Sequence, residues 1–194
     1  MECYSNNILK RSFFEKDTAE VAMNLLGKIL VRECESGLSA GIIIETEAYY
    51  GPQDPASHAF RGRTPRSRIM FGKAGIAYVY FCYGMYWLLN AVTEKETVPG
   101  AVLIRGLKPA EGIENMKRRR HIEDEGKLAD GPGRLTIAMG INGADNGIDM
   151  TDKKSRLYIS GDTAGGRMVR VEKTPRIGIK NGKDRLLRFV AAGL

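Results

Sequence analysis

The stretch Gly41-Ile-Ile-Ile-Glu-Thr-Glu-Ala-Tyr49 is the segment around which the rest of the chain is organised. Its apolar run, residues 42–44, is typical of a strand buried on both faces. Charge enters at the end of that strand with Glu45 and Glu47. Residues two apart on a strand share a face, so both carboxylates are expected on one side of the sheet, roughly 7 Å apart at about 3.3 Å of rise per residue. A half-buried glutamate has no packing role here, so the stretch is a candidate functional site.

The two glutamates allow three interpretations. Both can be solvated charges at a strand end, which is the ordinary situation for carboxylates. A pair at this spacing can also supply the acid and the base of a sugar hydrolase. Alternatively, a single glutamate can activate a water molecule as a general base.

Aromatic side chains are concentrated after this strand. They are Tyr49, Tyr50, Tyr78, Tyr80, Phe81, Tyr83, Tyr86 and Trp87. This concentration is typical of a pocket that stacks a flat ligand. Residues 77–82 and 85–92 are predicted to be two strands joined by a hairpin at Tyr83-Gly84, because glycine supplies the positive φ of a tight turn. A side chain at a hairpin tip cannot be buried in its own sheet, so Tyr83 is suited to act as a wedge in a base stack.

Three further polar residues are candidates for a functional site, two in apolar strands and one in a loop. Asn90 and Arg105 each break an apolar strand, which points to a polar cavity or an internal pair because buried polar groups need partners. His58 lies in a Gly-Pro loop, and one histidine alone cannot build a metal site. The ligand pattern of a zinc-dependent base deaminase is missing, so that class is excluded and no metal is expected.

Composition indicates an ordinary globular protein, and a basic charge alone fits either a polyanion-binding protein or one that is merely basic. The 194 residues are expected to form one domain, residues 1–194, and the net charge of +7 with four arginines in residues 61–68 favours nucleic acid. No apolar run approaches the roughly 20 residues of a membrane span, and the N-terminus lacks a secretory pattern. Three cysteines without a C-x-x-C spacing favour neither disulfides nor zinc. An intracellular protein without a membrane partner is therefore expected.

Strands dominate the predicted secondary structure, with helices scattered between them, which favours an α+β domain with a largely antiparallel sheet. Helices are predicted at 18–26, with Asp17 as the cap, from Pro109 to about Arg119, and in a short segment closed by Gly140. Strands are predicted at 28–33, 41–49, 77–82, 85–92, 100–107, 157–159, 168–172 and 187–190.

Several motifs resemble the alkyladenine (3-methyladenine) DNA glycosylase family. They are Glu-Thr-Glu-Ala-Tyr at 45–49, the Gly51-Pro52…His58 spacing, Thr64-Pro-Arg-Ser-Arg68, Tyr78-Val-Tyr80…Tyr83-Gly-Met-Tyr86…Asn90 and Leu103-Ile-Arg105. The resemblance is strong up to Pro109 and looser afterwards. It implies a curved antiparallel sheet, like that of the formyltransferase C-terminal domain, with surrounding helices and a protruding β-hairpin that enters the minor groove.

The resemblance implies excision of alkylated or deaminated purines, the class of 3-methyladenine, hypoxanthine and ethenoadenine, by a monofunctional glycosylase without a cofactor. Glu47 matches the general base that deprotonates a water aimed at C1′ of a flipped nucleotide. Arg105 matches the arginine that helps to hold this water and the carboxylate. One carboxylate then suffices, and Glu45 is expected to be structural.

The remaining matches concern contacts with the base and with the duplex. Tyr49, His58 and Tyr80 match residues that sandwich the flipped base, and Asn90 matches one that crowds the amino group of guanine. Tyr83 matches the tyrosine that intercalates in the vacated position. The expected contacts with the DNA backbone are Arg63, Arg66, Arg68, Met85 and Tyr86.

We therefore predict a DNA repair glycosylase that acts, as a monomer, on double-stranded DNA containing damaged purines. The alternatives are a non-catalytic nucleic-acid-binding domain of the same fold and a sugar hydrolase built on Glu45 and Glu47.

Overall fold

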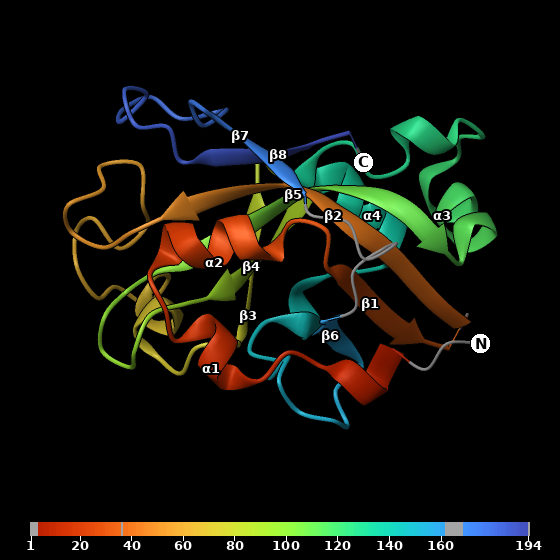
Figure 1. Cartoon of the computed structure of the whole chain (residues 1–194), viewed down its shortest axis with the longest axis horizontal. Helices are drawn as coiled ribbons and strands as arrows, with labels where there is room; N and C mark the ends of the chain where they lie inside the picture. Colours follow the sequence, from red (N-terminus) through yellow and green to blue (C-terminus); the bar gives the residue numbers. More distant parts are fainter. Residues whose placement is uncertain (1–3, 36, 162–168, 194) are drawn as a thin grey trace.

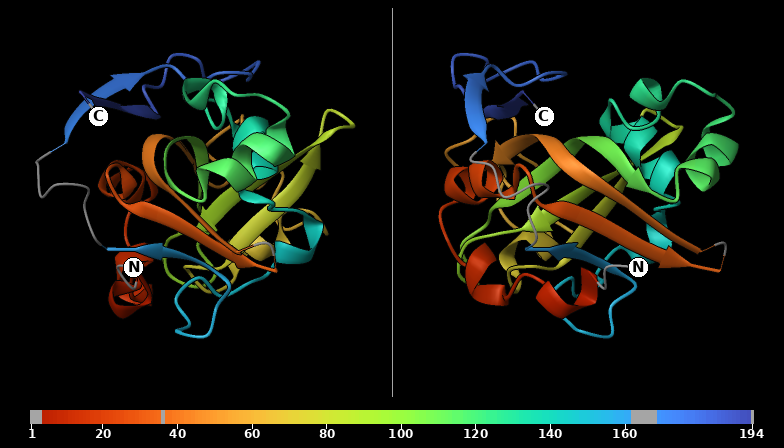
Figure 2. Two further views of the ribbon diagram at one scale, coloured as in Figure 1. Left: turned by 90° about the vertical axis from the view of Figure 1, so that its right-hand side faces the viewer. Right: turned by 45° about the vertical axis from the view of Figure 1, so that its right-hand side comes forward.

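The computed structural model describes residues 4–35, 37–161 and 169–193. In these residues eight strands form one sheet, and each pair of neighbouring strands is antiparallel. The strands are β1 (Ile29–Cys34), β2 (Gly37–Tyr49), β3 (Ala77–Cys82), β4 (Tyr86–Val92), β5 (Ala101–Glu111), β6 (Leu157–Ser160), β7 (Arg170–Thr174) and β8 (Arg188–Ala192). The sheet is twisted and curled, with short helices packed against it (Figures 1 and 2). The predicted α+β fold with a curved antiparallel sheet is confirmed.

Strand β2 is the centre of the sheet, whose main order is β3-β4-β5-β2-β1-β6. One edge of β2 pairs with β5 along most of its length. Its other edge pairs first with β1 and then, from Glu45 to Glu47, with β8. The end of β2 is therefore enclosed on both edges, and this is why its charged residues become buried.

The helices are short and lie against the sheet. They are α1 (Arg11–Phe14), α2 (Thr18–Leu25), α3 (Ile113–Arg120) and α4 (Pro132–Met139), with 3-10 turns η1 (Tyr4–Asn7), η2 (Arg68–Phe71), η3 (Glu125–Lys127) and η4 (Gly143–Asp145). As predicted, Asp17 caps α2 by accepting from the amides of Ala19 and Glu20, and α4 ends at Gly140, which has a φ of 68°. The Thr46 hydroxyl donates to the Ala22 carbonyl at 2.8 Å and so ties α2 to β2.

The helix predicted to begin at Pro109 is wrong. Pro109 lies in β5 opposite Gly41, where the register of the β2–β5 ladder shifts, and a proline without an N–H is tolerated at such an irregularity. The strand continues to Glu111, and the helix starts at Ile113 after Gly112, whose φ of 72° turns the chain. The observed β2 also begins earlier than predicted, at Gly37.

Two further predicted elements are close to the observed ones. The strand expected at 168–172 is observed as β7, and Met168 lies outside the described residues. The hairpin between β3 and β4 turns where predicted, but Tyr83 as well as Gly84 has a positive φ, of 53° and 69°. This hairpin extends beyond the rest of the sheet (Figure 2, left).

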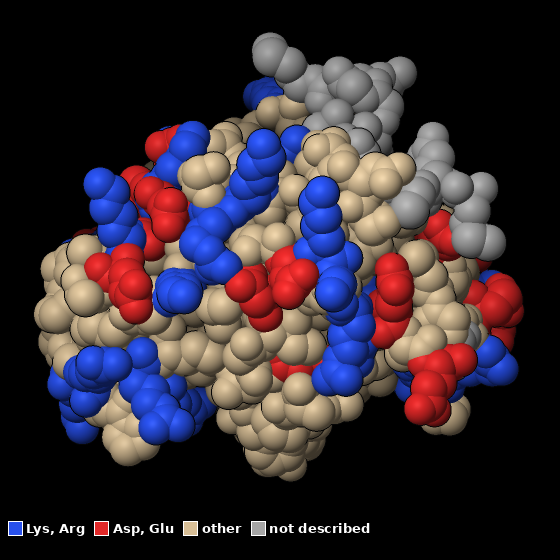
Figure 3. Space-filling model, turned by 90° about the horizontal axis from the view of Figure 1, so that it is seen from below, with Lys and Arg blue, Asp and Glu red and all other residues tan. Residues whose placement is uncertain are grey.

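The surface carries charges of both signs. On the face seen in Figure 3, Lys and Arg side chains are interspersed with Asp and Glu over most of the visible area. In the described part of the chain, no helix is both long and apolar enough to cross a membrane.

Candidate active site

One face of the sheet forms the wall of a pocket of about 320 Å³, at the lower end of the range for small-ligand sites. Alternate residues of neighbouring strands line it, as the period of two of a β-strand requires. They are Tyr49 of β2, Tyr78, Tyr80 and Cys82 of β3, Leu88 and Asn90 of β4, and Ala101, Leu103 and Arg105 of β5. His58 and Ile177 are among the loop residues that complete the wall.

The sheet register aligns the central site residues in one row. Glu47 is paired with Leu103, Leu103 with Asn90, and Asn90 with Tyr78. Adjacent strands lie about 4.8 Å apart, so this row crosses four strands in a short distance. The amide group of Asn90 donates to the Tyr78 carbonyl at 3.1 Å, which satisfies part of its hydrogen-bonding capacity. The register thus brings together side chains that are far apart in the sequence.

Glu47 is fully buried directly behind the pocket wall. Its carboxylate accepts hydrogen bonds from the Tyr49 hydroxyl at 2.7 Å, the Ile177 amide at 2.7 Å and the Arg105 guanidinium at 3.4 Å. All three donors line the pocket, whereas Glu47 itself does not. Burial raises the pKa of the Glu47 carboxyl, and the Arg105 charge and the other two donors oppose this without cancelling it.

Arg105 reaches both glutamates because the β2–β5 ladder is irregular here. The register skips Ile44 on β2 and Arg105 on β5, so Glu45 is paired with Gly106 and Thr46 with Ile104. A β-bulge of this kind redirects a side chain, and bulges are common beside active sites. The Arg105 side chain donates to Glu45 through Nε at 2.7 Å and to Glu47 through a terminal nitrogen at 3.4 Å.

Glu45 has a different environment from Glu47. Its Oε1 accepts from Nε of Arg105 at 2.7 Å and from Nε of Arg188 at 2.6 Å. Burial alone would raise the pKa of Glu45, but the two arginines outweigh this effect and hold that pKa below its ordinary value. The two arginines therefore keep Glu45 ionised at neutral pH, so the pair consists of one carboxyl with a lowered pKa and one with a raised pKa.

A cluster of three ring side chains, those of His58, Tyr78 and Tyr80, forms another part of the pocket wall. The Tyr80 ring meets the His58 ring edge-on at 4.6 Å between centroids, and the Tyr78 hydroxyl lies 2.8 Å from Nδ1 of His58. Arg66 lies over the Tyr80 ring, 4.9 Å from its centroid. Burial, with a smaller contribution from the Arg66 charge, lowers the pKa of His58 to about 4. His58 is therefore neutral at neutral pH.

The residues expected to contact DNA lie outside the pocket or at its mouth. Tyr83 lines the pocket at the hairpin tip and is 75% exposed, and Met85 beside it is 63% exposed. Tyr86 is half-buried against Gly133 of α4. Arg63 and Arg68 are exposed in the basic loop, as is Arg66.

Several residues of the site were missed in the sequence. Asp54 and Arg176 form a buried ion pair beside Glu47, Ile177 supplies an amide to the carboxylate, and Arg188 binds Glu45. Each of these arginines lies in the C-terminal part of the chain, where the motifs are looser. In the described residues no group of three or more His, Cys, Asp or Glu side chains is arranged to hold a metal ion.

A buried carboxylate behind an aromatic pocket, in a basic protein with an exposed aromatic hairpin tip, is typical of an enzyme that holds a flat base and activates water. Comparison with known proteins agrees. The sequence profile of the family described as methylpurine-DNA glycosylase matches residues 12–194. The chain belongs to this family.

The alignments with curated relatives cover most of this chain and most of each relative. The chain is 48% identical to a protein of Prosthecochloris aestuarii over 92% of this chain and 85% of that one. It is 46% identical to a protein of Methanocella arvoryzae over 93% of this chain and 89% of the other. Both relatives carry the name "Putative 3-methyladenine DNA glycosylase". The chain is thus a DNA glycosylase, a hydrolase that acts on N-glycosyl bonds, and a DNA repair enzyme. The family resemblance inferred from the motifs is confirmed.

Proposed function

We propose that this glycosylase flips alkylated or deaminated purines out of duplex DNA and hydrolyses their N-glycosidic bond with a water molecule that Glu47 activates. The substrates we propose are 3-methyladenine, which the names of the relatives mention, and also hypoxanthine and ethenoadenine. The product is an abasic site. The observation that carries the proposal is a fully buried carboxylate whose three hydrogen-bond donors all line the aromatic pocket.

Glu47 is the general base in this proposal. Its raised pKa makes the carboxylate a stronger proton acceptor than an ordinary glutamate carboxylate. Its contact with Arg105, at 3.4 Å, is the loosest of the three, so a water entering from the pocket would reach Oε2 most easily beside Arg105. The water oxygen attacks C1′, its proton passes to Glu47, and the C1′–N bond breaks with its electron pair leaving on the purine.

Tyr49, His58 and Tyr80 hold the flipped base, and Asn90 limits which bases fit. Tyrosine faces attract a cationic methylated purine by roughly 0.5 to 2 kcal/mol. His58 has a pKa of about 4 and therefore adds no positive charge that would repel such a base at neutral pH. A cationic methylated purine is already a good leaving group, so its release needs no strong general acid.

The hairpin tip and the basic loop contact the duplex. Tyr83, with 75% of its surface exposed, inserts where the base was, and Met85 and Tyr86 follow the groove edge. Arg63, Arg66 and Arg68 contact phosphates, which makes binding salt-dependent. Extrusion costs a few kcal/mol and is least costly for a damaged base, so weak pairing contributes to selection. We place all of these roles in one domain, residues 1–194, acting as a monomer.

The test is a glycosylase assay on matched duplexes that carry one hypoxanthine, ethenoadenine or 3-methyladenine, with the enzyme in excess and alkaline cleavage afterwards. We expect strand breaks only after alkali, since the chain is proposed to be monofunctional. Glu47→Gln should release the base about 10²- to 10⁴-fold more slowly yet still bind the lesion duplex. Excision by Glu47→Gln at the wild-type rate would overturn the role of Glu47, and failure to release any of these bases would overturn the substrate class.

A further inference from the structure

Asp54 and Arg176 form a buried ion pair beside the proposed general base. Two guanidinium nitrogens of Arg176 donate to the two carboxylate oxygens of Asp54, at 2.6 and 2.7 Å. Both side chains are completely buried. Pairs of this kind are poor sources of stability, because the cost of desolvating both charges is comparable to their attraction. The contacts of the pair with its neighbours are therefore more informative than its contribution to stability.

Arg176 lies between two of the donors that bind Glu47. Its guanidinium donates to the Ala48 carbonyl at 2.9 Å, on the strand between Glu47 and Tyr49. It also lies over the Tyr49 ring, 4.6 Å from the ring centroid. The next residue, Ile177, donates its amide to Glu47 at 2.7 Å. Displacement of Arg176 would therefore move both the Tyr49 hydroxyl and the Ile177 amide.

Asp54 extends the same connection to the loop that carries His58. Its carboxylate accepts from the amides of Tyr50 at 3.1 Å and Ala56 at 3.2 Å. Burial alone would raise the pKa of Asp54, but the hydrogen bonds from Arg176 and these amides hold that pKa below its ordinary value. The pair thus stays charged at neutral pH and joins the loop at 50–60 to the segment that begins at Arg176.

We propose that Asp54 and Arg176 are positioning residues that hold the Tyr49 hydroxyl and the Ile177 amide against Glu47. This proposal rests on the proposed role of Glu47 and names the two residues that fix the positions of its hydrogen-bond donors. Neither residue touches the substrate in this account, and each acts through its neighbours.

The charged and titratable groups around Glu47 come from every element packed against it. They are Arg105 of β5, Glu45 and Tyr49 of β2, Tyr80 of β3, Arg188 of β8 and Arg176 itself. Loss of the pair leaves Arg105 and Glu45 in place but removes two donors that lower the pKa of Glu47. That pKa then rises, and excision, which needs ionised Glu47, is lost at a higher pH than in the wild type.

The experiment uses the full chain and a duplex with one hypoxanthine, under single-turnover conditions with the enzyme in excess. The variants are Asp54→Asn and Arg176→Lys, because a lysine keeps the charge but cannot form the two-nitrogen contact. The readouts are the maximal rate, the enzyme concentration at half-maximal rate and the pH dependence. Thermal unfolding shows whether each variant folds.

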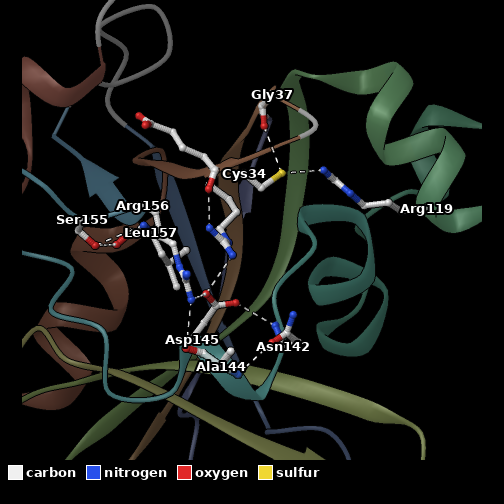
Figure 4. Close-up of polar contacts among 11 residues, drawn as sticks. Cys34, Gly37, Arg119, Asn142, Ala144, Asp145, Ser155, Arg156 and Leu157 are labelled. Atoms are coloured by element: carbon white, nitrogen blue, oxygen red, sulfur yellow. Dashed lines mark hydrogen bonds and ion pairs between the residues drawn. The ribbon is translucent and has the colours of Figure 1, made fainter.

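Asp145→Asn is the matched control. Asp145 is also fully buried and forms an ion pair with Arg32 at 3.0 Å. It also accepts from the Arg156 guanidinium at 3.0 Å and from the Asn142 amide (Figure 4). These residues do not line the pocket. The control therefore removes a comparable buried ion pair and leaves the environment of Glu47 unchanged.

We expect Asp54→Asn and Arg176→Lys to lower the maximal rate by about 10- to 100-fold, as for the loss of hydrogen bonds to a charged group. In Arg176→Lys, which keeps the positive charge, the acidic limb of the rate profile should move to higher pH. In Asp54→Asn the unpaired Arg176 charge opposes that shift, so the maximal rate is the readout for this variant. In both variants the half-maximal concentration should change much less than the rate. Asp145→Asn should lose stability without moving the acidic limb.

The outcomes separate the two proposals. If folded Arg176→Lys keeps the wild-type acidic limb, or if either folded variant loses no more activity than Asp145→Asn, the positioning role is overturned while the role of Glu47 stands. If Glu47→Gln is as active as the wild type, the proposed function itself fails. If Asp54→Asn does not fold, Arg176→Lys decides by the same criteria.

Discussion

Glu45 and Glu47 lie two residues apart on the same strand, yet their environments differ. Glu45 accepts from Nε of both Arg105 and Arg188, and the two arginines lower its pKa. Glu47 is more deeply buried, its one salt bridge among the residues that the structure describes is the 3.4 Å contact with Arg105, and its pKa is raised. The deeper burial of Glu47 and its looser contact with arginine, rather than the strand position, account for the opposite directions of the two pKa values.

The same arginine serves both residues, which makes the comparison experimentally accessible. Nε of Arg105 is committed to Glu45, and only a terminal nitrogen approaches Glu47. Glu45 therefore holds Arg105 in place, and Arg105 in turn limits how far burial can raise the pKa of Glu47. Substitutions at these positions should affect activity and stability in different proportions.

The largest expected effect on the excision rate comes from replacing each of the two glutamates by glutamine in turn. Glu47→Gln should lower the single-turnover excision rate by about 10²- to 10⁴-fold, the usual contribution of a general base. Glu45→Gln, the matched control on the same strand, should lose less than about tenfold, because it changes only the anchoring of Arg105. Alkaline cleavage of a hypoxanthine duplex measures both rates. Equal losses in the two variants would remove the distinction between them.

A smaller effect is expected for Arg105→Gln. The Arg105 charge lowers the pKa of Glu47, so its loss should raise that pKa and move the acidic limb of excision to higher pH. The rate at neutral pH should fall by about 10- to 100-fold, as for a lost charge-assisted contact. Arg188→Gln is the control, because Arg188 donates to Glu45 and Thr174 and not to Glu47. A shift of the limb in Arg188→Gln alone would reverse our assignment.

The next effect concerns one hydrogen bond. Tyr49→Phe keeps the ring but removes the hydroxyl that donates to Glu47 at 2.7 Å. This donor lowers the pKa of Glu47, so the acidic limb should move slightly upward, with a rate loss of about tenfold. Tyr50→Phe is a suitable control, since its hydroxyl contacts Asp17 outside the pocket. An unchanged profile in Tyr49→Phe would show that this bond does not set the basicity of Glu47.

The smallest effects are on stability, and they have opposite signs. Folding raises the pKa of Glu47, so ionisation of this residue lowers the free energy of unfolding as pH rises above 4.5. Glu47→Gln removes this cost and should therefore stabilise the fold at neutral pH by about 1 kcal/mol. Because folding lowers the pKa of Glu45, its contribution is present above 4.5 and is lost as pH falls through the folded pKa. Glu45→Gln should thus destabilise the fold at neutral pH by about 1 to 3 kcal/mol, a difference that shrinks in acid.

Urea unfolding at neutral and acidic pH measures both free energies of unfolding. A stabilised Glu45→Gln, or a destabilised Glu47→Gln, would contradict the assigned pKa directions.

The local parts of the fold could be predicted from the sequence. The Asp17 cap, the closing Gly140 and the β3–β4 hairpin follow from residue chemistry at single positions. Proline is common at the start of a helix, and this preference predicts a helix from Pro109. The shifted register of the β2–β5 ladder instead accommodates Pro109 in a strand. Such a shift depends on the partner strand, so no local pattern reports it.

The candidate site was only partly predictable for the same reason. Glu47, Arg105, Asn90 and the aromatic residues stand out because they interrupt or crowd apolar strands. Asp54 and Arg176 are 122 residues apart and gain their importance from a tertiary contact. Which of the two glutamates binds two arginines depends on the bulge at Arg105 and on the pairing of β2 with β8. Neither tertiary feature leaves a local pattern in the sequence.

The most direct test of the central claim is the pH dependence of single-turnover excision by the wild type, Glu45→Gln and Glu47→Gln, compared side by side. We predict that the wild type loses activity on the acidic side with a midpoint above the ordinary glutamate value of 4.5. Glu45→Gln should retain such a limb, and Glu47→Gln should show only a low residual rate without it. An acidic limb that persists in Glu47→Gln and disappears in Glu45→Gln would show that the other carboxylate is the base.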